Sequence, residues 1–259
     1  MDEETKSVAQ RFYAQFQRLY AQLQRNAGYL ARQEINVILE GIRSDPKRLE
    51  HFGFKVYSQN DEDGIIEQIF QRLNTKKGRF CEIGVESGLE SNTLYLIHKG
   101  WRGSWIEGNI KQRDGIENKF ASLIRNGRLR VHFELATAEN INDLFQKVSF
   151  NSEELDFLSI DIDGNDIYLM EAINFYPKVI CIEYNAKFPP QISKQQTYNP
   201  KQFWRGTDYM GSSLLALNDV ASKKGYTLVG TNITGANAFF VRNDCIENNF
   251  SENSTVAYL

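Results

Sequence analysis

The sequence predicts an α/β fold with a mainly parallel sheet, and three observations lead to this prediction. Apolar segments of strand length alternate with amphipathic segments of helical period along most of the chain. One strand runs directly into a glycine turn that opens a helix, and two others run directly into acidic residues. The 259 residues, of which 41% are hydrophobic and 24% charged, suffice for one large α/β domain with additions.

The glycine turn follows the strand Phe-Cys-Glu-Ile at residues 80–83 and extends from Gly84 to Gly88. Glycine at both positions permits a sharp turn and a close approach of the backbone to another group. Ser91 and the two residues after it then open a helix, since Ser and Asn are favoured N-cap types. The dinucleotide pattern Gly-x-Gly-x-x-Gly is absent, and Glu86 in the turn would repel a pyrophosphate. The turn therefore favours a cationic ligand such as S-adenosylmethionine.

The next two strands favour an adenosine-like ligand. Residues 103–109 contain a short strand that ends in an acid, Glu107. In strand–turn–helix–strand units an acid at this place commonly accepts the two hydroxyls of a ribose. A third strand at 129–135 is followed by Ala136 and two more small residues, which would let an adenine ring pack closely.

Polar residues gather at the ends of the two strands after these. One buried strand runs into Asp161 and Asp163, and the next runs into Glu183 and Asn185. The two aspartates could share one hard cation, or one could act as a base while the other orients it. Asp161, Glu183 and Asn185 would also form an oxygen-ligand set for Mg²⁺ or Ca²⁺. Equally, these groups could bind substrate hydroxyls or cap helices without a metal.

Three segments of the chain are expected. Residues 1–50 form a helical extension, interrupted at Gly28, that covers the core, acts as a lid or mediates dimerisation. Residues 51–247 form the α/β domain, which ends in an antiparallel pair of strands. Residues 248–259 form a flexible tail.

Three segments inside the α/β domain carry further expectations. The acids at 61–63 either lie favourably in the first turn of a helix or take part in binding. One helix is expected at 110–128. The long polar loop at 188–206 has a binding role or is disordered.

Composition excludes several classes of protein. The net charge of −3 and the pI near 5.8 argue against a nucleic-acid binder that relies on phosphate neutralisation. No apolar run approaches the roughly 20 residues needed to span a bilayer, and the start lacks the order of a signal peptide. Cys81, Cys181 and Cys245 are odd in number and widely separated, which suggests neither a disulfide framework nor a zinc ribbon. We therefore expect a cytoplasmic protein.

The order of these features resembles the class I S-adenosylmethionine-dependent methyltransferases, specifically the FkbM-like group. The residues that carry the resemblance are Tyr57 to Asp63, Glu82 to Gly84 with Gly88, Glu107, and Phe157 to Gly164, followed by the last two strands. The resemblance covers roughly residues 55–243. It implies a Rossmann-like, seven-stranded, mostly parallel sheet with an antiparallel last strand. It also implies methyl transfer to a hydroxyl of a sugar or natural-product-like small molecule.

The resemblance also implies roles for individual residues. The cofactor-binding residues would be Gln59, Glu82, Gly84, Gly88, Ser91, Glu107 and Ala136. The catalytic residues would be Asp161 and Asp163, with Asp208 and Tyr209 near the substrate. The end of the strand at Glu183 and Asn185 is similar to the metal-binding end of cation-dependent O-methyltransferases, which favours Mg²⁺ bound with Asp161.

Two other classes remain as alternatives. The chain could be a catalytically silent α/β module that docks through its N-terminal helices, although a silent domain gains nothing from burying several acids. An NAD-dependent oxidoreductase is disfavoured by the absent glycine pattern.

Overall fold

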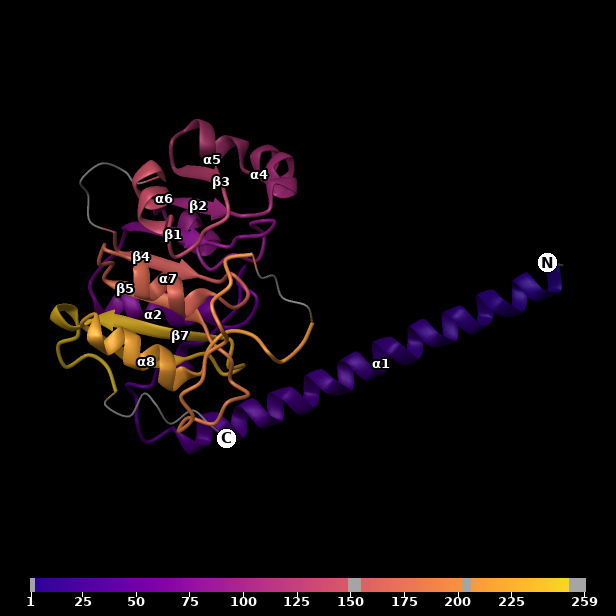
Figure 1. Cartoon of the computed structure of the whole chain (residues 1–259). Helices are drawn as coiled ribbons and strands as arrows, with labels where there is room; N and C mark the ends of the chain where they lie inside the picture. Colours follow the sequence, from indigo (N-terminus) through magenta and orange to yellow (C-terminus); the bar gives the residue numbers. More distant parts are fainter. Residues whose placement is uncertain (1–2, 149–154, 202–205, 252–259) are drawn as a thin grey trace. The chain divides into compact units, whose positions relative to one another are not determined.

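The computed structural model describes residues 3–148, 155–201 and 206–251 (Figure 1). The described chain separates after Pro46 into two compact units. The first contains one long helix, α1 (Glu3–Gly41), and the second contains the sheet with its covering helices.

The second unit is built on a seven-stranded sheet. Its strands are β1 (Arg79–Ile83), β2 (Arg102–Glu107), β3 (Leu129–Phe133), β4 (Phe157–Ile160), β5 (Val179–Glu183), β6 (Tyr226–Thr231) and β7 (Asn237–Arg242). They lie in the order β3-β2-β1-β4-β5-β7-β6. Strands β1 to β5 are parallel to one another, and β7 runs antiparallel to both β5 and β6. The predicted sheet with its antiparallel last strand is therefore confirmed.

Helices cover both faces of this sheet. One face packs against α6 (Ile141–Val148), α7 (Asp166–Ala172) and α8 (Leu214–Lys223). The other packs against α2 (Glu62–Arg72), α3 (Leu94–His98), α4 (Arg113–Lys119) and the turn η1 (Leu49–Phe52). Two-sided burial explains why the strands read as continuous apolar runs, as in residues 179–182 of β5, which are fully buried. The remaining helical segments are η2 (Ile110–Gln112), α5 (Ala121–Arg125) and η3 (Asn243–Cys245).

The prediction of a single helix at 110–128 is wrong, because three shorter helical segments, η2, α4 and α5, occupy this part of the chain. The break between α4 and α5 falls at Phe120, whose buried ring packs edge-on against Trp105 with centroids 4.8 Å apart. Gly88 lies against the same two rings, because a Cβ there would lie 2.6 Å from Trp105. Core packing thus explains the glycine at 88, together with its φ of +73°.

The N-terminal extension also differs from the expected interrupted helix. α1 is continuous through Gly28, since one glycine costs only about 1 kcal/mol in a helix interior. Its large apolar side chains, among them Phe12, Leu19 and Leu30, are exposed. Within the described part of the chain, no helix combines the length and the apolar character that crossing a membrane requires.

The first residues of the expected flexible tail are packed. Phe250 is buried in one of the two cores, and the guanidinium of Arg72 lies 5.5 Å from its ring centroid. The Nζ of Lys47 donates to Oδ1 of Asn248 at 2.7 Å. Residues 252–259 of that expected tail lie outside the described residues.

Candidate active site

Four neighbouring strands end in one row of residues at the carboxyl edge of the sheet. In the parallel ladder, Ile83 pairs with Ile106 and Ile160, and Ile160 pairs with Ile182. The next residue on each of these strands belongs to the row, which consists of Glu107, Gly84, Asp161 and Glu183. The strand order reverses between β1 and β4, so the row crosses the switch point at which α/β folds bind ligands.

Gly84 lets the ends of β1 and β4 meet. A Cβ at this position would lie 1.7 Å from the carbonyl oxygen of Asp161, and the φ of Gly84 is +83°. The backbone N–H of Asp161 donates to the carbonyl of Ile83 at 3.0 Å. The close backbone approach predicted at Gly84 is therefore made by the protein itself, and it sets the position of Asp161.

Asp166, the first residue of α7, holds the turn after β4 and is almost completely buried. Its Oδ1 accepts from the N–H of Ile162 and its Oδ2 from the N–H of Gly164, both at 2.8 Å. Burial raises the pKa of Asp166 to about 6. Asp163, in the same turn, has a φ of 59°, which few residues other than glycine adopt. Asp166 thus positions the turn that carries Asp161 and Asp163.

Replacing Asp166 with asparagine is expected to lower the free energy of unfolding by about 1–3 kcal/mol, the cost of leaving a buried donor unsatisfied. The amide offers one acceptor oxygen to two backbone donors. Urea unfolding followed by circular dichroism measures the change. Asp114→Asn is the matched control, because Asp114 is exposed in the first turn of α4. Equal stability of the two variants would contradict the positioning role.

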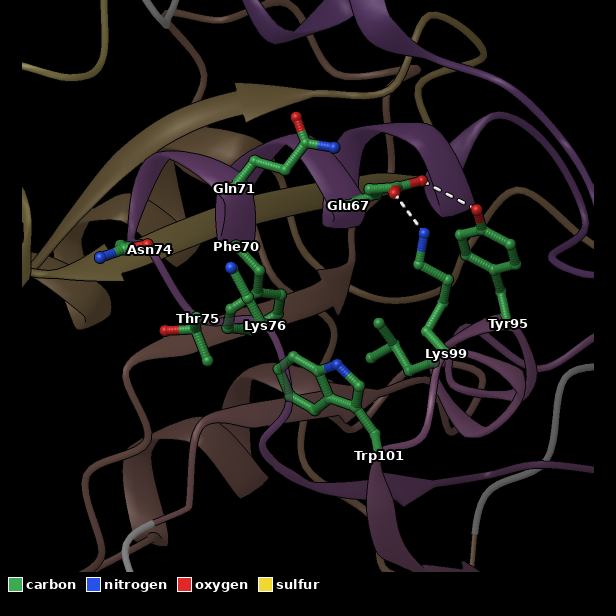
Figure 2. Close-up of a pocket in the computed structure, with 10 residues that line it drawn as sticks. Glu67, Phe70, Gln71, Asn74, Thr75, Lys76, Tyr95, Lys99 and Trp101 are labelled. Atoms are coloured by element: carbon green, nitrogen blue, oxygen red, sulfur yellow. Dashed lines mark hydrogen bonds and ion pairs between the residues drawn. The ribbon is translucent and has the colours of Figure 1, made fainter.

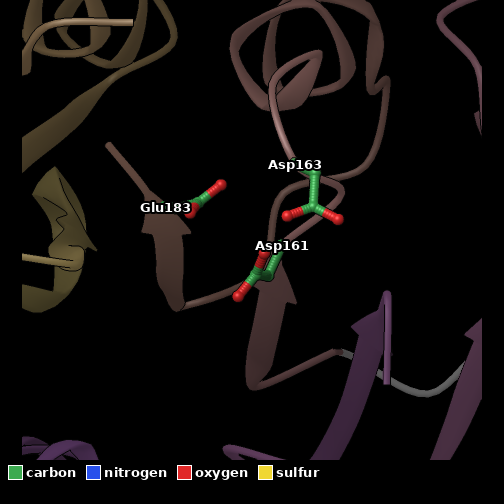
Figure 3. A group of neighbouring side chains, drawn as sticks. All are labelled: Asp161, Asp163 and Glu183. Carbon is green, nitrogen blue, oxygen red and sulfur yellow. The ribbon is translucent and has the colours of Figure 1, made fainter. Parts of the chain in front are cut away.

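Three carboxylates come together beside this turn (Figure 3). Asp161, Asp163 and Glu183 each place one oxygen within 4.8 Å of the others. Burial, followed by the neighbouring charges of Asp161, Asp166 and Asp163, raises the pKa of Glu183 to about 10. Burial also raises the pKa of Asp161 well above its ordinary value, with the charge of Asp166 next in size. So many acids at short range favour a bound proton or a bound cation.

The donor set fits a divalent cation. Among the described residues, Oε2 of Glu183 is one of the buried side-chain oxygens without a hydrogen-bond partner. Such an orphaned oxygen costs about 1–3 kcal/mol. Carboxylate oxygens are ligands that Mg²⁺ and Ca²⁺ prefer, so Asp161, Asp163 and Glu183 have the chemistry to hold one.

Asn185, the third member of the predicted metal set, holds the loop after β5. Its amide donates to the carbonyls of Asp208 at 3.0 Å and Met210 at 3.1 Å, and its Oδ1 accepts from the N–H of Lys187 at 3.0 Å. The carboxylate of Asp208 forms an ion pair with Lys187, and both side chains are exposed. Tyr209 is also exposed. The two predicted substrate residues therefore lie on a loop that Asn185 anchors to the end of β5.

The described part of the long polar loop, residues 188–201, is held along the carboxyl edge. The hydroxyl of Tyr168 in α7 donates to the carbonyl of Gln196 at 2.7 Å. The hydroxyl of Tyr198 accepts from the N–H of Ala138, in the segment after β3, at 3.2 Å. The loop thus extends from the end of β3 to the start of α7. Residues 202–205 of the predicted loop lie outside the described residues.

Glu107 shapes the glycine turn from the end of β2. Its two buried oxygens accept from the backbone N–H groups of Glu86 at 2.7 Å and Asn109 at 2.6 Å. Burial raises the pKa of Glu107. The backbone of Val85 also hydrogen-bonds to this carboxylate. A carboxylate has about four acceptor positions, so Glu107 retains the capacity to accept a hydroxyl group. Ala136, the predicted adenine contact, is buried in the segment after β3.

Glu82 faces the start of α3 rather than open solvent. It is buried in β1 and accepts from the N–H groups of Asn92 at 2.8 Å and Thr93 at 3.2 Å. Burial raises the pKa of Glu82 to about 7. The carboxylate therefore holds the two residues that lead into α3, and Ser91 is buried immediately before them. The amide of Asn92 continues the network to the hydroxyl of Ser159 in β4 at 3.1 Å.

The acidic run at the start of α2 makes hydrogen bonds within the protein. Oδ2 of Asp63 accepts from the N–H groups of Tyr57 at 2.6 Å and Ser58 at 3.0 Å. The fully buried Glu62 accepts from the amide of Asn232, between β6 and β7, at 2.7 Å. These contacts favour the structural reading of the run. Gln59, the predicted cofactor residue beside it, is exposed.

Comparison with known proteins identifies the fold. No protein-family model and no curated protein matches the sequence. A putative caffeoyl-CoA O-methyltransferase from Staphylococcus aureus is similar in structure, at 15% sequence identity and a TM-score of 0.50 over 84% of this chain and 99% of the other. The chain has the fold of the class I S-adenosylmethionine-dependent methyltransferases.

Two further solved structures resemble the chain more distantly. An O-methyltransferase from Bacillus cereus in complex with SAH has 15% identity and a TM-score of 0.44, over 80% of this chain and 88% of the other. An SAH-bound methyltransferase from Podospora anserina has 14% identity and a TM-score of 0.46, over 71% of this chain and 79% of the other.

A separate pocket of about 350 Å³ lies between α2 and α3 of the methyltransferase fold (Figure 2). Phe70 and Trp101 contribute apolar surface to it. On its rim, Glu67 accepts from the hydroxyl of Tyr95 at 2.9 Å and from Lys99 at 2.8 Å. None of the lining residues belongs to the row at the carboxyl edge, so this pocket is distinct from the candidate active site.

Proposed function

We propose that this chain is an S-adenosylmethionine-dependent O-methyltransferase of the FkbM-like group, acting on a hydroxyl of a sugar or natural-product-like small molecule. The observation that carries the proposal is the row Glu107, Gly84, Asp161 and Glu183 at the switch point of a methyltransferase fold. An acid suited to a ribose and acids suited to an acceptor lie on opposite sides of one glycine turn. That arrangement supports a ligand lying across β1.

The residues of the row divide into two tasks. Glu107 would bind the ribose, and the turn from Gly84 to Gly88 would lie against the methionine part. When bound, S-adenosylmethionine supplies a methyl group on a positively charged sulfur. In the absence of a cation, Asp161 or Asp163 would accept the proton of the acceptor hydroxyl, and the raised pKa of Asp161 would make its ionised form a stronger base than an ordinary carboxylate.

We also propose that Asp161, Asp163 and Glu183 hold Mg²⁺ during this reaction. The orphaned oxygen of Glu183 and the three converging carboxylates support this assignment. A divalent cation at this position would lower the pKa of an acceptor hydroxyl. Asn185 would contribute by holding the adjoining loop through its hydrogen bonds to the backbone.

Calorimetric titration with S-adenosylhomocysteine tests the proposal. We expect binding to the wild type and an affinity about 10- to 150-fold weaker for Glu107→Gln, equal to the roughly 1.5–3 kcal/mol of hydrogen bonds to a charged group. Glutamine retains one of the two oxygens that accept from the turn. Urea unfolding of Glu107→Gln therefore accompanies the titration, and an affinity loss without a matching loss of stability identifies the ligand contact.

The matched control for this titration is Glu117→Gln, because the side chain of Glu117 in α4 is half exposed. Its affinity should equal that of the wild type. Failure of the wild type to bind, with or without Mg²⁺, would overturn the proposal in favour of a non-catalytic module.

A further inference from the structure

Helix α1 contains a seven-residue repeat that becomes evident once the helix is known to be continuous. Three consecutive heptads read Gln-Arg-Phe-Tyr-Ala-Gln-Phe at 10–16, Gln-Arg-Leu-Tyr-Ala-Gln-Leu at 17–23 and Gln-Arg-Asn-Ala-Gly-Tyr-Leu at 24–30. A repeat of this length along one helix is the signature of a coiled coil.

Two interleaved series of positions form the apolar stripe of this repeat. The first series is Ala9, Phe16, Leu23, Leu30 and Val37, and the second is Phe12, Leu19, Asn26, Gln33 and Glu40. The large apolar members of both series are exposed, over a range from 56% for Phe16 to 72% for Phe12. They follow the alternating spacing of four and three residues that places side chains along one seam.

The period of the stripe favours a helical partner over a flat surface. An ideal helix turns about 20° out of phase with each seven-residue repeat, so the stripe winds around α1 by roughly 80° between Ala9 and Val37. A second helix can follow that winding by supercoiling, whereas a membrane surface cannot. The arginines of the repeat at 11, 18, 25 and 32 occupy the helix side opposite the stripe.

The distribution of polar residues favours a parallel pairing with an identical helix. Apolar residues fill the second series at Phe12 and Leu19, and polar ones follow at Asn26 and Gln33. In a parallel pair each residue faces its own copy, so Asn26 can hydrogen-bond to Asn26 in the other helix. An antiparallel pair would instead set these amides against the apolar half of the seam, where they would lack partners.

The exposed area is large enough for a stable dimer. Six apolar residues of the two series and the adjoining Tyr13 and Tyr20 are each more than half exposed. Covering them would remove on the order of 800 Å² from each protomer, which matches one side of a standard protein interface.

We propose that α1 forms a parallel coiled-coil dimer with a second copy of this chain, through the seam of Phe12, Phe16, Leu19, Leu23 and Leu30. Sedimentation equilibrium of the full chain is then expected to give twice the protomer mass of 29.9 kDa. The double variant Leu19→Asp, Leu23→Asp should weaken dimerisation by roughly 100-fold or more, because it buries unpaired charges.

The matched control is the double variant Gln17→Asp, Gln24→Asp, which adds the same two charges outside the seam. It should remain a dimer, and circular dichroism of both variants shows whether the helix is retained. A monomeric wild type would overturn the proposal. If that monomeric wild type binds anionic lipid vesicles and the variant Leu19→Asp, Leu23→Asp does not, the stripe is a membrane-binding surface instead.

Cysteine cross-linking tests the parallel orientation. In a Cys245→Ser background, where the remaining Cys81 and Cys181 are buried, Asn26→Cys should form a disulfide-linked dimer on oxidation. Gln24→Cys, outside the seam, should not. A dimer in which Asn26→Cys stays reduced would overturn the parallel arrangement.

Discussion

Alanine at position 84 is expected to prevent the carboxyl edge of the sheet from forming. The added methyl group would lie 1.7 Å from the carbonyl oxygen of Asp161, and a φ of +83° is unfavourable for any L side chain. Relief requires β1 and β4 to separate, so we expect the free energy of unfolding to fall by about 4 kcal/mol or more. Urea unfolding measures this loss, and titration with S-adenosylhomocysteine measures the accompanying loss of binding.

Gly115→Ala provides the control for this experiment. Gly115 lies in α4, and a Cβ there has no atom within 4 Å. Alanine at this position is expected to stabilise the protein by about 0.5–1 kcal/mol. Near-native stability of Gly84→Ala would show that the two strand ends do not meet as described.

The wild type is expected to lose stability as pH rises because Glu183 is buried, and Glu183→Gln is expected to abolish this loss. Because the pKa of Glu183 rises from 4.5 to about 10 on folding, the folded protein binds more protons than the unfolded chain between these values. Stability therefore falls as pH rises through this window, by at most about 1.4 kcal/mol per pH unit. Below pH 4.5 both states are protonated and the penalty is absent. Asp161, Asp163 and Asp166 face the same carboxyl group and increase the effect.

Thermal unfolding in chelator-containing buffer from pH 5 to 9 measures this difference. The unfolding midpoint of the wild type should fall steadily with rising pH. The midpoint of Glu183→Gln should fall less and should be the higher of the two at pH 8. Replacing the chelator with Mg²⁺ should raise the midpoint of the wild type more than that of the variant. Glu171→Gln, at an exposed position of α7, should follow the wild type. Identical pH profiles for wild type and Glu183→Gln would contradict the burial of this carboxyl group.

Much of the sheet was predictable because its strands are buried on both faces. Apolar runs ending in glycine or acids predicted β1, β4 and β5, and the alternating segment at 129–135 predicted β3. The members of the row at the carboxyl edge were also predictable, since the sequence places each of them at the end of a strand. They are Gly84, Glu107, Asp161 and Glu183. Their alignment was not predictable, because register and strand order depend on pairing between distant segments.

The partners of the polar side chains were the least predictable part of the site. Glu82 holds the two residues that lead into α3, and Asn185 holds backbone carbonyls of its loop. Both uses depend on turns whose geometry the sequence does not specify. The role of Asp166 is easier to predict, because an aspartate shortly after a glycine turn commonly accepts hydrogen bonds from nearby backbone N–H groups. The apolar stripe of α1 predicts a covered surface but leaves a core cover, a lid and a dimer contact open, because apolar periodicity is the same whether the covering surface belongs to the same chain or to another.

The position of β7 has a consequence for the synthesis of the protein. β7 is the last strand to be made, yet it lies between β5 and β6. One edge of β5, which is apolar from Val179 to Ile182, therefore stays without its partner until residues 237–242 have left the ribosome. An unpaired apolar edge readily pairs with strands of other chains. The nascent chain is thus most exposed to aggregation after β5 has been made and before β7 closes the sheet.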